Sequence, residues 1–293
     1  MEIETMAYAI STVPKRTSHH IRSTKDWLAL IGLILIALIM LFPIIVLLIN
    51  AFKNQVEYTQ YGPLTLPRSF TLDNISSFWK SSNFPVKVIN SVVISGSVAI
   101  IGVALSVLNS FAIGIGKFRG NRAMTLLILL ANMAPQEALL YPLYALFKNI
   151  GIYDTQLPVI IIFSIIQSAY GTYLLSAVYG TFPQAILEAA VIDGATKGQI
   201  LRRIVLPISW PTISVLFVFF FVWTWNEYMI PMSLLISDNV QTVPLALAPL
   251  QGQYVVSATS LAGASLLSII PTIIIYIFFQ HQLTNGIVAG AVK

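Results

Sequence analysis

Six apolar stretches separated by polar segments run along the chain. They lie near residues 27–50, 88–116, 122–147, 157–180, 208–231 and 260–282. Each can cross the roughly 30 Å hydrocarbon core of a bilayer as an α-helix, which pairs its backbone groups where lipid offers no partner. The pattern predicts an all-α polytopic membrane protein with six spans. Pro135 and Pro142 predict a kink in the third span, because proline lacks a backbone donor.

The first apolar run is preceded by a polar segment, residues 1–26. The run exceeds the roughly 7–15 residues of a signal-peptide core, and no small-residue cleavage site follows it. We therefore expect a retained helix after an N-terminal tail. Residues 27–283 then form one membrane domain, and residues 284–293, which are too polar and glycine-rich to span, form a C-terminal tail.

The composition agrees with a lipid-embedded protein. Hydrophobic residues make up 57% of the chain and charged residues only 9%, whereas a soluble domain carries roughly 25% charged residues. The chain contains no cysteine and three scattered histidines. Disulfides and thiolate metal sites are excluded, and no metal site is expected.

Basic residues predict the orientation. A cytoplasmic N-terminus places 11 of them in inner segments and 5 in outer segments, which satisfies the positive-inside rule. The inner residues are Lys15, Arg16, Arg22, Lys25, Lys117, Arg119, Arg122, Lys197, Arg202, Arg203 and Lys293, and the outer ones are Lys53, Arg68, Lys80, Lys87 and Lys148. Six spans put both termini in the cytoplasm. The net charge of +5 thus reflects membrane orientation and not nucleic-acid binding.

The chain lacks the motifs of an energy-converting enzyme. It contains no G-x-x-x-x-G-K-[ST] phosphate loop, no His-Glu-x-x-His and no Gly-x-Ser-x-Gly. The glycines of segment 114–120 have the wrong spacing, and a helix end leading into a turn explains them. We expect a non-catalytic subunit that binds no cofactor, so any ATP hydrolysis belongs to another polypeptide.

The cytoplasmic connection 181–207 predicts a helix–turn–helix. Residues 184–192 form a good helical run that Pro183 can open, and Gly194 fits the stop, where a left-handed conformation is easiest without a side chain. Residues 199–205 can form a second short helix, after which Pro207 restarts the chain. Two interpretations remain on physical grounds alone, namely a docking element for another protein and an amphipathic loop on the membrane surface.

The same connection resembles the cytoplasmic signature of binding-protein-dependent ABC importer permeases. That signature reads Glu-Ala-Ala, three residues, Gly, nine residues, then Ile-x-Leu-Pro. Every position is matched, by Glu188, Ala189, Ala190, Gly194, Ile204, Leu206 and Pro207. The resemblance implies a type I importer permease in the bacterial cytoplasmic membrane, with these residues and Asp193 coupling it to ATPase subunits.

Other segments point to the sugar branch of that family. Asn90-Ser91 and Phe118-Arg119-Gly120 are similar to family segments near the second span. Segment 225–228, Trp-Asn-Glu-Tyr, resembles the sugar branch, and segment 282–293 resembles the end of the smaller maltose-type permease, although one terminal glycine is missing. Resemblance covers residues 27–293. It implies import of a di- or oligosaccharide; an amino-acid, peptide or glycerol-phosphate importer and a secondary transporter are the alternatives.

The resemblance also implies an assembly. The partners would be a second, homologous permease, two ATPase subunits that hold ATP and Mg²⁺, an extracytoplasmic sugar-binding protein and membrane lipid. The tail would insert between the ATPase subunits and contact them through Asn285, Gly286, Gly290 and Lys293. A frayed terminus is the alternative for this tail.

Two further features bear on the transport pathway. Measured along straight helices at 1.5 Å per residue, Glu137 and Glu227 fall in the outer half of the membrane, where charges normally face a cavity or a partner. With Asn132 and Asn226 they are candidates for the pathway or its gate. The alternative for Glu137 is a buried structural hydrogen bond near the Pro135 kink, and the alternative for Glu227 is an interfacial position beside the neighbouring aromatic residues. The outer segment 51–87 is rich in aromatic residues and predicts either an interfacial cap or a docking surface.

Overall fold

The computed structural model describes residues 24–116, 118–133, 135–251 and 257–291, and it describes side chains as far as Gln280 except that of Gln251. Throughout these residues the regular secondary structure is helical. The chain divides into two compact units, residues 1–46 and 47–293. Helix α2 begins in the first unit and ends in the second, whereas all other described elements belong to the second. The N-terminal tail lies outside the described residues up to residue 23.

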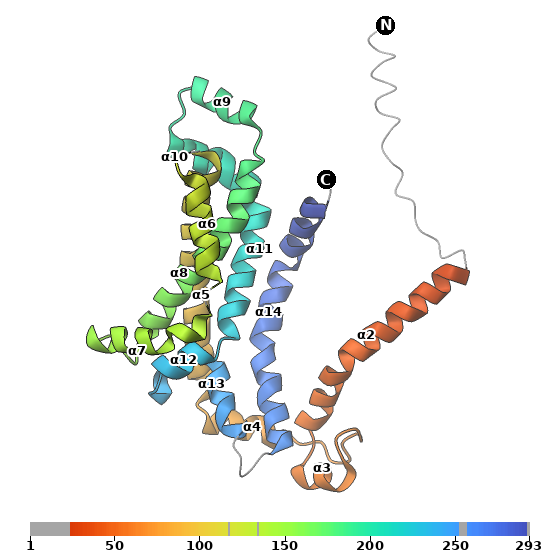
Figure 1. Cartoon of the computed structure of the whole chain (residues 1–293). Coiled ribbons are helices and arrows are strands. Elements are labelled where there is room, and N and C mark those ends of the chain that lie inside the picture. The colour runs from red at the N-terminus through yellow and green to blue at the C-terminus, as the bar shows by residue number, and fades with distance from the viewer. Residues whose placement is uncertain (1–23, 117, 134, 252–256, 292–293) are drawn as a thin grey trace. The chain divides into compact units, whose positions relative to one another are not determined.

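Five long apolar helical runs, counted over the described residues, could each cross a membrane. They are α2 (Thr24–Ala51), α5 (Phe84–Ser110) continued by the π-helix η1 (Phe111–Ile115), α8 (Gln156–Gly180), the run from α10 (Lys197–Ile200) through the π-helix η3 (Leu201–Val205) to α11 (Leu206–Trp225), and α14 (Ala258–Ala291). These runs coincide with five of the six predicted spans (Figure 1). The all-α polytopic fold is confirmed.

The third predicted span is broken. Helix α6 (Asn121–Asn132) is followed by η2 (Gln136–Leu139) and α7 (Leu140–Asn149), and the chain bends by 85° between them. Pro135 has an extended backbone at the break, with ψ of 122°. Its missing N–H prevents α6 from continuing. The third predicted span is thus a bent pair of helices, and the straight helix along which the depth of Glu137 was predicted is interrupted before that residue.

The fifth span ends earlier than predicted. Helix α11 stops at Trp225, and α12 (Met229–Leu234) begins after three residues. Pro231 explains the break, because inside a continued α11 its ring would clash with the carbonyl four residues before it. Glu227 accepts a hydrogen bond from the backbone N–H of Met229 at 3.1 Å. Glu227 thus lies beyond the span and at the start of the next helix.

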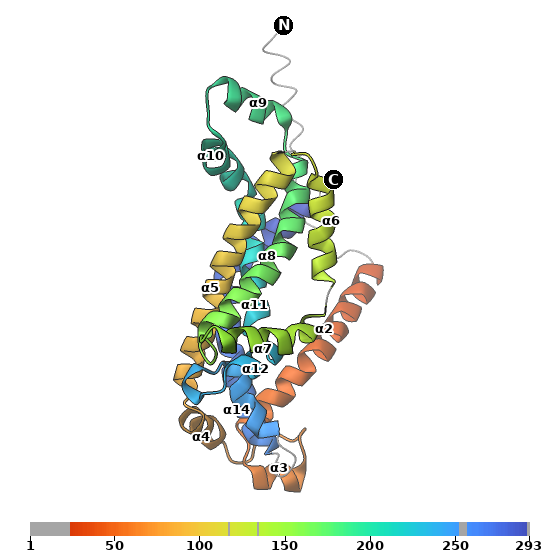
Figure 2. The same ribbon diagram turned by 60° about the vertical axis from the view of Figure 1, so that its left-hand side comes forward.

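Helices α5 and α8 make the most extensive helix–helix contact of the described elements, and they lie side by side in both ribbon views (Figure 2). Small residues let the two backbones approach, as is typical of membrane helices. The hydroxyl of Ser106 donates to the carbonyl of Gly102 at 2.6 Å and to that of Ser168, across the interface, at 3.2 Å. A Cβ atom on Gly171 would lie 2.3 Å from the Ser106 Oγ.

The segment between α2 and α5 is folded around two buried charges. It contains α3 (Gln55–Tyr61) and α4 (Asp73–Ser81). The Lys53 ammonium donates to the carbonyls of Gly62 and Thr65 and to the Thr65 hydroxyl. The Glu57 carboxylate accepts from the backbone N–H of Arg68, which lowers the pKa of Glu57 below its ordinary value. This internal network shows that the segment is structured; the interfacial cap and the docking surface both stay predictions.

The connection between α12 and α14 consists of η4 (Asp238–Val240), α13 (Val243–Leu247) and η5 (Ala248–Gln251). It lies with α3 and α4 at one end of the second unit, whereas α9 (Gln184–Ile192) lies at the other end (Figure 1). The backbone of α14 continues without a break to Ala291, so most of the predicted tail, residues 284–291, is helical. Lys293 lies outside the described residues.

Candidate functional site: the helical connection between α8 and α11

The connection that carries the signature begins with α9. This helix spans Gln184–Ile192, as the sequence predicts, and Pro183 precedes it as the N-cap. One face of α9 packs inward, with Ala190 buried and Leu187 partly buried against the core of the second unit. Glu188 and Ala189 lie on the exposed part of the helix. A helix held on one face and free on the other is suited to docking.

The turn after α9 has the predicted left-handed glycine. Gly194 adopts φ of +77°, a conformation that side chains with a Cβ atom rarely adopt. The backbone N–H of Ala195 donates to the carbonyl of Ala190 at 2.9 Å, which closes the turn. Thr196 and Gln199 then start α10 through a reciprocal capping box. The turn is therefore fixed by local hydrogen bonds on both sides.

The second helix of the connection differs from the prediction. It begins at Lys197 instead of Gln199 and runs through η3 into α11, so Pro207 does not separate it from the fifth span. The π-helical geometry explains the continuity. The N–H of Leu206 donates to the carbonyl of Leu201, five residues earlier, and the wider turn accommodates a proline that offers no donor.

A recess of about 550 Å³ separates α9 from the end of α5. Its walls come from η1 and its following glycine on one side and from α9 and α10 on the other: Phe111, Ile115, Gly116, Gln184, Leu187, Glu188, Val191, Ile192, Lys197 and Ile200. Ile192 is 85% exposed although it is apolar. Glu188 is the acidic group of this recess. The site thus combines an apolar floor, a free apolar tip and one acid.

The signature residues do not all lie on this exposed face. Asp193 and Gly194 are exposed with Glu188 and Ala189, as is Pro207 at the start of α11. Ile204 and Leu206 instead pack against the core of the second unit. The structure therefore divides the signature into a surface part that can contact another protein and a packed part that holds the connection on α11.

The four candidate pathway residues are not brought together. Asn132 ends α6 and donates to the carbonyl of Ile128 at 2.8 Å, and Glu137 is exposed in η2. Asn226 follows α11 and donates to the carbonyl of Val222 at 2.7 Å. Among the described residues, no hydrogen bond or ion pair joins the first pair to the second. Their shared role in a pathway stays a prediction.

A polar pair between α8 and α11 was not predicted from the sequence. Gln167 is fully buried and donates to the Thr224 hydroxyl at 2.8 Å, while its own Oε1 has no partner in the described part of the chain. Beside it, the Tyr170 ring packs against Phe219 and Trp223 at centroid distances of 5.5 and 6.3 Å. Phe219 and Trp223 stand four residues apart, which places them on one face of a helix. Because neither residue is charged, this spacing in an apolar run does not by itself indicate a site. No group of three or more metal-ligating side chains occurs within the described ranges.

Comparison with known proteins shows the family of the chain. Residues 109–284 match the family described as "Binding-protein-dependent transport system inner membrane component". The "Inner membrane ABC transporter permease protein YcjP" of Escherichia coli is 29% identical over 89% of this chain and 94% of its own length. The "Arabinooligosaccharides transport system permease protein AraQ" of Halalkalibacterium halodurans is 31% identical over 92% of this chain and 96% of its own.

A solved structure supports the fold. A chain of a bacterial ABC transporter involved in import of the acidic polysaccharide alginate superposes with a TM-score of 0.74 at 20% identity, covering 90% of this chain and 99% of that one. The matched family region contains α8, the connection with its signature and α11. The protein is therefore a member of the family of inner membrane components of binding-protein-dependent transport systems.

Proposed function

We propose that this chain is the permease subunit of an ATP-driven, binding-protein-dependent importer of a di- or oligosaccharide. The observation that carries the proposal is the exposed, half-anchored α9 with Glu188 and Ala189 on its free face and Gly194 at its stop. The carbohydrate assignment rests on the resemblance of segments 225–228 and 282–293 to sugar permeases and on the arabinooligosaccharide relative.

The proposed assembly supplies what this chain lacks. A second, homologous permease completes the pathway, and an extracytoplasmic binding protein delivers the sugar. Two partner subunits bind ATP and Mg²⁺ and hydrolyse ATP, and one of them receives α9. Closure of these subunits pushes on α9, whose rigid turn passes the movement to α8 and α11. The spans then alternate between outward-facing and inward-facing states. In this arrangement the α9 end of the second unit and both termini face the cytoplasm, in agreement with the positive-inside rule.

Purification and reconstitution test the proposal. The tagged chain should recover a second permease and ATPase subunits from its native membrane. In proteoliposomes with the binding protein, oligosaccharides should stimulate ATP hydrolysis, whereas amino acids and peptides should not. Recovery of the chain without ATPase subunits, together with uptake driven by an ion gradient, would instead support a secondary transporter. Stimulation by an amino acid or a peptide would reassign the substrate class and leave the mechanism unchanged.

The C-terminal contact belongs to the same proposal. Asn285, Gly286 and Gly290 lie on the helical continuation of α14, so this segment would reach the ATPase subunits as a helix and not as an extended tail. Removal of residues 286–293 should then reduce recovery of the ATPase subunits in the purification above. Full recovery with normal turnover would identify the segment as a dispensable terminus.

The acids near the broken helices give a separate prediction. Glu137→Gln and Glu227→Gln, tested one at a time, should each lower oligosaccharide uptake while the complex still assembles, because both carboxylates would meet the polar pathway. Asp73→Asn, which neutralises an exposed acid in α4, is the matched control and should leave uptake unchanged. Uptake rates and apparent affinities equal to wild type in both variants would remove these acids from the pathway.

A further inference from the structure

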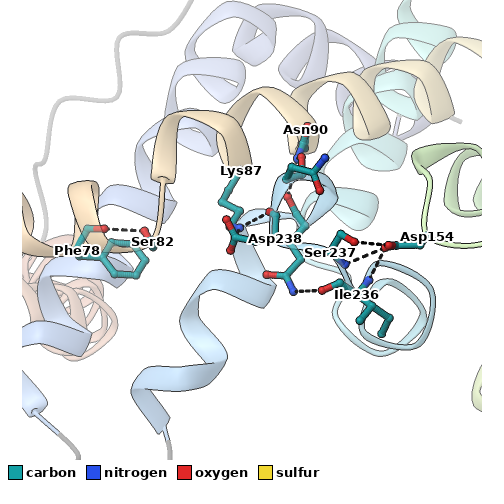
Figure 3. Close-up of polar contacts among 10 residues, drawn as sticks. Phe78, Ser82, Lys87, Asn90, Asp154, Ile236, Ser237 and Asp238 are labelled. Atoms are coloured by element: carbon teal, nitrogen blue, oxygen red, sulfur yellow. Dashed lines mark hydrogen bonds and ion pairs between the residues drawn. The ribbon is translucent and has the colours of Figure 1, made fainter.

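The segment 236–243, which follows α12 and includes the first residue of α13, is held by side chains from distant parts of the chain. Figure 3 shows Lys87 and Asn90 on α5 and Asp154 in the turn before α8 converging on it. Ser91, next to Asn90, also takes part. We call Lys87, Asn90, Ser91 and Asp154 the latch residues. They lie between 82 and 152 positions away from the groups that they bind.

Most of the contacts are made to the backbone of the segment; the Ser237 hydroxyl and the Asp238 carboxylate are the side chains that take part. The Asp154 Oδ1 accepts from the N–H groups of Ile236 at 2.8 Å and Ser237 at 2.9 Å. The Asn90 amide donates to the carbonyls of residues 239 and 241 at 2.8 and 2.9 Å. The N–H of Val243 donates to the Ser91 hydroxyl at 2.9 Å. Backbone recognition fixes the path of a segment whatever its side chains are.

One charge pair adds to these contacts. The Lys87 ammonium is 1% exposed and donates to the carbonyl of Asp238 and to its Oδ1, whereas the Asp238 side chain is 72% exposed. A buried ammonium requires an anion or several acceptors, so Lys87 holds the segment down.

Asp154 stays ionised at neutral pH. Its hydrogen bonds from the Ser237 hydroxyl, the Ser237 N–H and the Ile236 N–H lower the pKa of Asp154 below its ordinary value. Because the pKa is lowered in the folded state, this stabilisation is present at neutral pH and is lost only as the pH falls through the lowered value. The anchor at Asp154 is thus maintained throughout the physiological range.

Helices α5 and α8 also reach the connection that contains α9, at the opposite end of the second unit. Helix α8 runs from Gln156, which donates to the Asn90 Oδ1 at 2.7 Å, to Gly180, just before α9. Helix α5 continues through η1 to the wall of the recess beneath α9. The tightly packed α5–α8 pair therefore joins the latch residues at one end to the surroundings of α9 at the other.

We propose that Lys87, Asn90, Ser91 and Asp154 are positioning residues that make segment 236–243 move with the α5–α8 pair, and not with α11 and α14, to which the chain joins it. The proposal rests on the proposed function, since it gives α9 a mechanical connection to the face where the binding protein docks. The segment presents residues 236–239 there, all exposed. The position of the segment would therefore depend on the state of the ATPase subunits, and the binding protein would contact it there.

A cross-link gives the decisive test. Because the chain contains no cysteine, Ser91→Cys combined with Val243→Cys creates a single pair at two residues that contact each other, the Val243 N–H with the Ser91 hydroxyl. Mass spectrometry of the oxidised complex establishes that the disulfide has formed before activity is measured. The oxidised complex should retain sugar-stimulated ATP hydrolysis and uptake within about twofold of the reduced complex. A loss of about tenfold or more, which corresponds to 1.4 kcal/mol, would be clearly distinguishable from this result. Loss of uptake on oxidation, restored by reduction, would mean that the segment must leave α5 and would overturn the proposal.

Removing contacts of the latch residues should, in contrast to the cross-link, reduce the stimulation by sugar. Asn90→Ala combined with Asp238→Asn removes the amide contacts and the carboxylate partner of Lys87. Basal ATP hydrolysis should persist, while stimulation by the sugar-loaded binding protein should fall about tenfold or more, because each lost hydrogen bond weakens the hold on the segment. Ser233→Ala, which removes a hydroxyl bonded within α12, is the control and should keep full stimulation.

Two outcomes of the loosening experiment contradict the proposal. Full stimulation in the loosened variant would show that the segment needs no anchor, and a parallel fall in basal and stimulated hydrolysis would indicate a merely structural role. Failure of the proposed function is distinguishable from either, because the wild-type complex would then show no sugar stimulation. If the loosened variant does not assemble, the cross-linked complex still decides the question.

Discussion

Gly194→Val should abolish sugar-stimulated ATP hydrolysis while the permease still inserts and folds. Gly194 lies at φ of +77°, and no other atom lies within 4 Å of the position that a Cβ atom would take, so the substitution strains the backbone without creating a clash. A β-branched residue in this conformation costs about 1–3 kcal/mol. The turn avoids this cost by leaving the left-handed region, which swings α9 away from its docking position.

Glu188→Ala should have a similar effect by a different route. Glu188 is the acid on the exposed face beside the recess, and a partner arginine or lysine buried against it would lose its counter-ion. Breaking a buried pair in this way costs roughly 3–5 kcal/mol, more than the loss of an exposed pair. The reconstituted complex should therefore lose stimulated hydrolysis by at least about tenfold, since 1.4 kcal/mol corresponds to that factor.

Gly198→Ala is the control for both variants. Gly198 lies in α10, has no positive φ and has open space around it, so alanine there should leave coupling unchanged. Normal stimulated hydrolysis in both Gly194→Val and Glu188→Ala would remove α9 from the coupling mechanism. Loss of membrane insertion in either variant would show that the effect lies in folding.

Gly171→Ala should strongly destabilise the permease. A Cβ atom there would lie 2.3 Å from the Ser106 Oγ and 2.8 Å from the Phe220 ring. Neither neighbour can move freely, because Ser106 is bonded across the α5–α8 interface and Phe220 is fully buried. Overpacking of this kind costs about 1–3 kcal/mol. We expect a lower unfolding temperature and a smaller yield of assembled complex in detergent.

Gly96→Ala provides the matched comparison. Gly96 also lies within a spanning helix, but nothing would approach its Cβ atom within 4 Å. Alanine there should be neutral or should stabilise the helix by up to about 1 kcal/mol. Equal unfolding temperatures for the two variants would show that α5 and α8 separate easily, and the proposed mechanical connection between them would lose its physical basis.

The sequence predicts spans, turns and the signature loop because each depends on local physics. Hydrophobic length sets the spans, and Gly194 sets the stop of α9 because few other residues adopt positive φ. The break after Asn132 and the early end of α11 are local as well, but prolines in membrane helices often cause only a kink. Pro135 and Pro231 break the helix here, and only the three-dimensional context decides between these outcomes.

The latch could not be predicted in the same way. Asn90-Ser91 stands out in the sequence only through resemblance, and its partners are the backbone groups of residues 239–243, which leave no trace in side-chain identity. Gln167 and Thr224 raise the same difficulty, because an uncharged polar residue in an apolar run does not reveal which helix it faces. Pairings across 50 or more residues need the packed structure.

The π-helical η3 allows the helical register between α10 and α11 to change. A π turn contains one more residue than an α turn, so η3 holds an extra residue between α10 and α11. Conversion of η3 to α geometry would shift α10 by about 1.5 Å along the helix axis and turn it by about 100°, without breaking either end. A movement of α9 can therefore reach α11 as a change of helical register, that is, as a rotation combined with a short shift along the helix axis.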